Sequence, residues 1–88
     1  MPPAAVKVTL KLYATLRDYF PAGSGQTQAI VDLPDGATIP DALAIFAVPL
    51  AKAHIVMING RHVLRPDLAA RALADGDQLA VFPAIGGG

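Results

Sequence analysis

The sequence contains no cysteine, and every acidic residue in it is aspartate. Without cysteine the chain cannot form a disulfide framework, a cysteine-ligated zinc or iron–sulfur site, or a thiol nucleophile. Aspartate favours caps and turns over helix interiors, so we expect short helices and many turns. The longest apolar runs are too short to span a bilayer, and Met1-Pro2-Pro3 lacks a basic leader segment. We therefore expect a cytoplasmic protein without a membrane anchor.

The charges balance, because seven basic residues face seven acidic ones. The basic residues form no cluster along the sequence, so nothing predicts binding to nucleic acid or to a membrane surface. The chain has 88 residues, and 53% of all residues are hydrophobic. This size and composition predict one small globular domain with a modest core.

Hydrophobic periodicity and turn residues divide the chain into short elements. Strict alternation over 6–13 indicates a strand with one buried face, and Asn59-Gly60 is a strong hairpin signal. In chain order the patterns predict a strand over 6–13, a short helix over 15–20, a strand over 27–33, a helix over 39–48, strands over 54–58 and 61–64, a helical turn over 66–73 and a strand over 78–82.

The helix over 39–48 carries the clearest start and stop signals. Thr38 is a plausible N-cap, Asp41 stands in a capping-box position, and Pro40 falls in the first turn. Pro49 is expected to end the helix. One apolar stripe contains Ile39, Leu43 and Phe46. The economical fold is therefore α+β, with this helix packed across one face of a mixed sheet of about five strands.

Several apolar residues are expected on the outer face of that sheet, away from the helix. They are Tyr13, Met57, Ala80 and Phe82. Scattered exposed apolar residues are common, but a contiguous patch beside the start of the C-terminal tail indicates a docking site. We therefore expect this part of the outer face to be a docking site.

The C-terminal stretch has an unusual composition. Pro83 ends the last predicted strand, and the tail closes on three glycines, Gly86-Gly87-Gly88. Glycine leaves the backbone free to pass through a narrow channel, which suits delivery of a terminal carboxylate to another protein. A glycine run is equally typical of a frayed terminus or an expression remnant. The expected division is a folded domain over 1–83 and a flexible tail over 84–88.

Four motifs in order and spacing resemble one family. They are Lys11-Leu12-Tyr13-Ala14-Thr15-Leu16-Arg17, Met57-Ile58-Asn59-Gly60, Asp75-Gly76-Asp77, and Phe82-Pro83 followed by Gly87-Gly88. In this combination the chain resembles the ubiquitin-like sulfur-carrier family (MoaD/ThiS type). The Lys-Leu-Tyr-Ala opening and the length are most similar to the small subunit of molybdopterin synthase. The resemblance implies a ubiquitin-like β-grasp fold.

The resemblance also implies a chemistry. An E1-like enzyme adenylates the terminal glycine carboxylate, and a sulfur donor converts the adenylate to a thiocarboxylate. The tail then enters an acceptor enzyme, here the molybdopterin synthase large subunit. By position, Gly88 is the reacting residue and Gly87 its partner, while the surface that binds the enzymes would comprise Tyr13, Met57, Phe82, Pro83, Ile85 and Gly86. The chain would bind no cofactor and would not itself be an enzyme, since ATP-Mg is used by the activating enzyme.

This tail departs from the common ending of the molybdopterin branch, Phe-Pro-Pro-Val-Ala-Gly-Gly. Ala84 replaces a proline, and Gly86 replaces the small residue before Gly-Gly. Alternatives therefore remain: a carrier for thiamine, cysteine or a sulfur-containing secondary metabolite, a modifier joined to lysine, or a non-catalytic interaction module with an inert tail.

Two further groups of residues have side chains that can bind ligands or partners. His54 and His62 flank the hairpin without an obvious third ligand, so no metal site is expected. Arg61, Arg65 and Arg71 follow the hairpin as solvated residues that could also meet an acidic partner surface.

Overall fold

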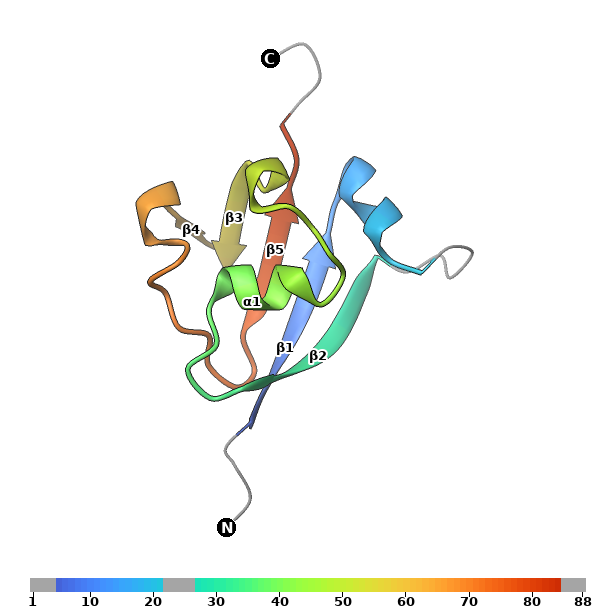
Figure 1. The fold of residues 1–88 in the computed structure, drawn as a ribbon. Coiled ribbons are helices and arrows are strands. Elements are labelled where there is room, and N and C mark those ends of the chain that lie inside the picture. Colours follow the sequence, from blue (N-terminus) through green and yellow to red (C-terminus); the bar gives the residue numbers. More distant parts are fainter. Residues whose placement is uncertain (1–4, 22–26, 85–88) are drawn as a thin grey trace.

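The computed structural model describes residues 5–21 and 27–84 (Figure 1). Its strands form one mixed sheet in the order β2-β1-β5-β3-β4, with β1 and β5 parallel and the other neighbours antiparallel. The strands are β1 (Ala5–Leu12), β2 (Gln28–Pro34), β3 (Ile55–Ile58), β4 (Arg61–Val63) and β5 (Gln78–Phe82). The helices are α1 (Ile39–Ala44) and the 3-10 segments η1 (Ala14–Tyr19), η2 (Leu50–Lys52) and η3 (Arg65–Asp67).

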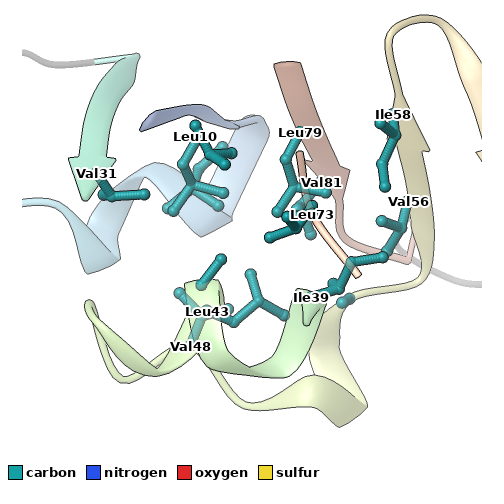
Figure 2. Packing of buried hydrophobic residues seen from close by; sticks show 14 of the residues in the cluster. Leu10, Val31, Ile39, Leu43, Val48, Val56, Ile58, Leu73, Leu79 and Val81 are labelled. Atoms are coloured by element: carbon teal, nitrogen blue, oxygen red, sulfur yellow. The ribbon is translucent and has the colours of Figure 1, made fainter. Parts of the chain in front are cut away.

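Helix α1 lies across one face of this sheet, which is the predicted ubiquitin-like β-grasp arrangement (Figure 1). The alternation in β1 works as expected, because Val8, Leu10 and Leu12 are fully buried. From the opposite side, Ile39 and Leu43 of α1 point at the strands, as Figure 2 shows. The strands therefore have an inner face that packs on α1 and an outer face that no helix covers in the part of the chain described.

The start of α1 is as predicted. The Thr38 N–H donates to Asp41 Oδ2 over 2.9 Å, and Pro40 lies in the first turn, where a missing N–H costs little. A half-buried Phe46 extends the apolar stripe and meets Phe20 edge to face, with ring centroids 5.0 Å apart. The sequence pattern therefore identified both the first residue and the buried side of this helix.

The end of α1 was predicted wrongly. The helix stops at Ala44 rather than Val48, and Pro49 does not end it. Instead Ala47 adopts φ 57°, and the Val48 N–H donates to the Leu43 carbonyl over 3.0 Å. This is a Schellman motif, with Leu43 and Val48 both buried as its usual apolar pair. Glycine normally occupies the left-handed position of such a cap. Because Ala47 stands there instead, the sequence did not indicate that the helix ends before it.

Two other helical expectations also needed correction. The segment over 15–20 is a 3-10 helix that starts at Ala14, where φ is 52°. The helical turn over 66–73 is confined to η3 and a turn after it, and Ala72 instead forms an isolated bridge with Thr38. Short 3-10 pieces are typical connectors where no long amphipathic stripe is available.

The two expected turns are joined to each other. Asn59 and Gly60 take φ values of 52° and 82°, as a tight two-residue hairpin requires. Asn59 Nδ2 donates to Asp77 Oδ1 over 2.9 Å, and the Gln78 N–H donates to Asn59 Oδ1 over 2.9 Å. Asp77 is buried, and its other carboxylate oxygen accepts from the Ala74 N–H over 2.8 Å. Asn59 thus fixes the β3–β4 hairpin against the start of β5.

Candidate docking site at the root of the tail

Strand β5 carries the chain to the tail, and it is held on both sides up to its last residue. The Tyr13 N–H donates to the Val81 carbonyl over 3.1 Å. On the other side, the His54 N–H donates to the Phe82 carbonyl over 2.9 Å. Pro83 follows immediately and is half-buried. The tail therefore leaves from a fixed point in the middle of the sheet (Figure 1).

The outer face around this point is apolar. The Tyr13 and Phe82 rings stack with centroids 4.3 Å apart and an interplanar angle of 12°. In the β3–β5 ladder, Ile55 is the register partner of Phe82, and Met57 is that of Ala80. These five residues form what we call the tail-root patch. Tyr13 is 39% exposed and Ile55 is 40% exposed, so the patch is open to solvent. It is an apolar surface, since none of its five residues is charged.

The structure brings together three residues that the sequence had placed in the site, Tyr13, Met57 and Phe82. Pro83 adjoins them directly along the chain. Ile85, Gly86, Gly87 and Gly88 lie outside the described residues. Ile55 was not among the predicted site residues, although alternation from Met57 places it on the same face. What was absent from the sequence was the register that sets it opposite Phe82.

The other end of the same face is polar. Lys7 Nζ and Asp32 Oδ1 form an ion pair at 2.8 Å. Between the two ends, Lys11 is the register partner of Ala80 and borders the tail-root patch, and its Nζ donates to Gln78 Oε1 over 2.9 Å. The hydrogen bond and the charge of Asp32 raise the pKa of the Lys7 ammonium above its usual value. Both side chains of the pair are 69% exposed, so solvent screens this attraction strongly.

A hollow of about 490 Å³ borders the root of the tail between η1 and η2. Leu16 and Tyr19 contribute from η1, Lys52 from η2, and Pro83 from just beyond the end of β5. Lys52 Nζ lies 5.9 Å from the centroid of the Tyr19 ring, within reach of a cation–π contact. A protein that binds the chain beyond Phe82 would therefore contact two surfaces. One is the tail-root patch, and the other is this hollow beside Pro83.

The two histidines do not come together with further ligands. His54 precedes β3, whereas His62 lies opposite Met57 in β4, and both are exposed. Within residues 5–21 and 27–84, no three His, Asp or Glu side chains are grouped so that they could hold a metal ion. Over the same residues, the helices are too short and too polar to cross a bilayer.

Comparison with known proteins agrees with this architecture. A curated Haloferax volcanii protein named small archaeal modifier protein 3 is 31% identical over 96 residues, covering 94% of this chain and all of that protein. A Haloferax volcanii protein solved in solution superimposes with a TM-score of 0.73 at 33% identity, covering 96% of this chain and 88% of the other.

A further solved structure extends the likeness of the fold. A Pyrococcus furiosus protein named molybdopterin converting factor, subunit 1 gives a TM-score of 0.64 at 24% identity, covering 91% of this chain and 99% of that one. The sequence profile described as the ThiS family matches residues 10–88. The chain therefore belongs to the ThiS family of ubiquitin-like sulfur carriers and modifiers.

Proposed function

We propose that this protein is a sulfur carrier that acts in molybdenum cofactor (molybdopterin) biosynthesis. An E1-like enzyme adenylates the Gly88 carboxylate, and a sulfur donor converts it to a thiocarboxylate that gives up its sulfur in the acceptor enzyme. The observation that carries this proposal is the tail-root patch, which lies where β5 ends and the Gly-rich tail begins. The choice of the molybdopterin pathway rests on the motif from Lys11 to Arg17.

The proposed chemistry requires only a carboxylate from this chain. An α-carboxylate has a pKa of roughly 3.3–3.7, so at neutral pH it is an anion and a poor acyl donor. Adenylation by ATP forms a mixed anhydride and releases pyrophosphate. A sulfur nucleophile then attacks the Gly88 carbonyl carbon, and AMP departs with the electron pair of the broken C–O bond. Glycine leaves this carbonyl uncrowded, and the partners supply ATP-Mg and the sulfur, so the protein is a co-substrate and not an enzyme.

The patch offsets the cost of ordering the tail. Fixing the backbone of each glycine costs about 1–2 kcal/mol, or roughly 3–6 kcal/mol for three. Burying apolar surface contributes about 25 cal/mol per Å², so roughly 200 Å² of covered patch contributes about 5 kcal/mol. The stacked rings of Tyr13 and Phe82, together with Ile55, are the side chains that would supply this area. The patch thus lies next to the tail, so its burial can offset the free energy needed to order the tail.

The test is the intact mass of the protein after incubation with ATP-Mg, sulfide and the E1-like enzyme of its own organism. We expect the mass to rise by the difference between sulfur and oxygen, with the change confined to the C-terminal peptide. A variant lacking Gly88 is the control and should not change. If no E1-like enzyme of the organism produces the shift, while each converts its own carrier, the proposal is wrong.

A second function is favoured by the names of the relatives, which are modifier proteins. The small archaeal modifier protein 1 of Haloferax volcanii is 29% identical to this chain, with a TM-score of 0.66 over 91% of it. In that function, a lysine Nε attacks the activated Gly88, an isopeptide bond forms, and AMP leaves. Tagged protein expressed in its own cells should then carry branched lysine peptides ending in Gly87-Gly88. Their absence, alongside a detectable thiocarboxylate, would leave sulfur transfer as the function.

A further inference from the structure

The sheet edge formed by β4 combines a hollow with an imbalance of charge. Beyond β4 the chain turns through η3 at the margin of the sheet, with β3 between β4 and β5 (Figure 1). A hollow of about 390 Å³ lies there. Its lining comprises His62, Val63, Leu64, Asp67, Ala70 and Arg71. Leu64 is 58% exposed, so the wall of the hollow offers apolar surface as well as charge.

The charge of this edge contrasts with that of the remaining chain. Residues 61–71 contain three arginines and one aspartate, which gives a net charge of +2. The whole chain is neutral, so the other residues together carry −2. The three arginines, spread along the sequence, gave no obvious basic run. In the structure Arg61 belongs to β4, Arg65 belongs to η3, and Arg71 follows the turn after η3.

The arginines are not equally available. Arg65 Nη2 donates to the Ala53 carbonyl over 2.6 Å, so its guanidinium ties η3 to the end of η2. In the part of the chain that the structure describes, the one ion pair is Lys7–Asp32, at the far side of the sheet. Arg61 and Arg71 are exposed, and neither has a carboxylate partner among the described residues. Their charge is free to act on another molecule.

This edge is continuous with the tail-root patch. His62 lines the hollow and is also the register partner of Met57, which belongs to the patch. A molecule that covers Ile55 and Met57 and extends across β3 therefore reaches the hollow directly. The two surfaces form one path from the tail to the edge of the sheet.

We propose that the β4 edge, with Arg71 at its hollow, binds an acidic segment of the E1-like enzyme that receives the tail. This inference rests on the proposed function, because it assigns a second contact to the same partner. The segment has carboxylates that pair with Arg71 and Arg61, and one apolar side chain that rests on Leu64. A protein segment fits better than nucleic acid, since Asp67 lines the hollow and the adjoining patch is apolar.

The contact acts mainly on the rate at which the two proteins associate. Exposed charges steer association over roughly a Debye length, about 8 Å at physiological ionic strength, and salt weakens the effect. Arginine suits this role because its planar guanidinium can hold a carboxylate through two hydrogen bonds. The patch would then limit dissociation, while the edge accelerates binding and fixes the orientation of the domain relative to the tail.

The first test measures association rate constants with the E1-like enzyme that converts the wild-type protein. We expect Arg71→Glu to slow association about fivefold at low salt, with the difference fading as salt is raised. Arg17→Glu is the matched control, because Arg17 is also exposed but lies on η1. Asp67→Asn should act in the opposite direction. Equal rates for the Arg71 and Arg17 variants, with normal thiocarboxylate formation, would overturn the inference and leave the proposed function intact.

A second test does not depend on the function. Amide shifts of the labelled protein are followed during titration with a synthetic peptide of alternating glutamate and leucine. We expect the shifts to centre on residues 61–71 and Met57, and to disappear in Arg61→Glu/Arg71→Glu. Shifts that centre elsewhere, or none at all, would contradict the inference. Tighter binding of single-stranded poly(U) to the same residues would assign the edge to nucleic acid instead.

Discussion

The two ends of the outer sheet face differ although β1 runs from one end to the other. At the end where β5 finishes, Tyr13, Ile55 and Phe82 present rings and aliphatic groups. At the opposite end, Lys7 and Asp32 form an exposed ion pair. Alternation alone places all of these residues outside, so core packing does not explain the contrast. The apolar end coincides with the root of the tail, which agrees with the docking role that we propose for it.

The largest effect should come from placing a charge in the tail-root patch. Ile55→Asp is expected to weaken binding to the activating enzyme by about 2 kcal/mol, roughly 30-fold, because a carboxylate would be desolvated in an apolar interface. Ile30→Asp is the matched control, since Ile30 is also on the outer face but is 70% exposed on β2. Dissociation constants from calorimetry provide the comparison. Equal losses in both variants would show that the patch is not special.

A smaller effect, on stability alone, should come from the turn that fixes the polar end. Asn59→Ala removes the side-chain bonds to Asp77 and Gln78 and leaves alanine at positive φ. We expect the free energy of unfolding to fall by about 2–3 kcal/mol in urea titrations, with binding unchanged for the folded fraction. Asn59→Gly separates the causes, because glycine accepts this backbone and should recover about 1 kcal/mol. No difference between the two variants would mean that backbone strain is negligible there.

The smallest effect is expected at the ion pair. Asp32→Asn keeps the shape of the side chain and removes the charge beside Lys7. Since both partners are largely exposed, we expect the thermal midpoint of unfolding to stay within measurement error at neutral pH. A clear fall in the midpoint would show that the polar end contributes more to stability than its exposure suggests. Such a fall would also weaken the comparison between the polar end and the apolar end of the outer face.

Local patterns in the sequence were sufficient to predict most of the fold. Alternation identified the strands, and Thr38 with Asp41 located the start of α1. The end of α1 could not be predicted, because Ala47 takes a conformation usually left to glycine and shows no sign of it in the sequence. Local signals are reliable where a residue type has a strong preference, and fail where tertiary packing imposes an uncommon conformation.

The candidate site was predictable in composition and unpredictable in arrangement. Tyr13, Met57 and Phe82 were recognised as outer-face residues, but their assembly depends on strand order and register. The link from Asn59 to Asp77 spans 18 positions, so no local pattern reveals it. The placement of Arg71 beside His62 and Leu64 at one hollow likewise follows from how the chain returns along the sheet edge. Pairing between distant segments is what the structure adds.

The central position of β5 also has a mechanical consequence. An enzyme that draws on the tail pulls along the axis of a strand bonded to β1 on one side and to β3 on the other. Such a load is shared by the hydrogen bonds of both ladders in shear, whereas an edge strand would peel away one bond at a time. The central position of β5 therefore lets the sheet bear a pull on the tail better than an edge strand would.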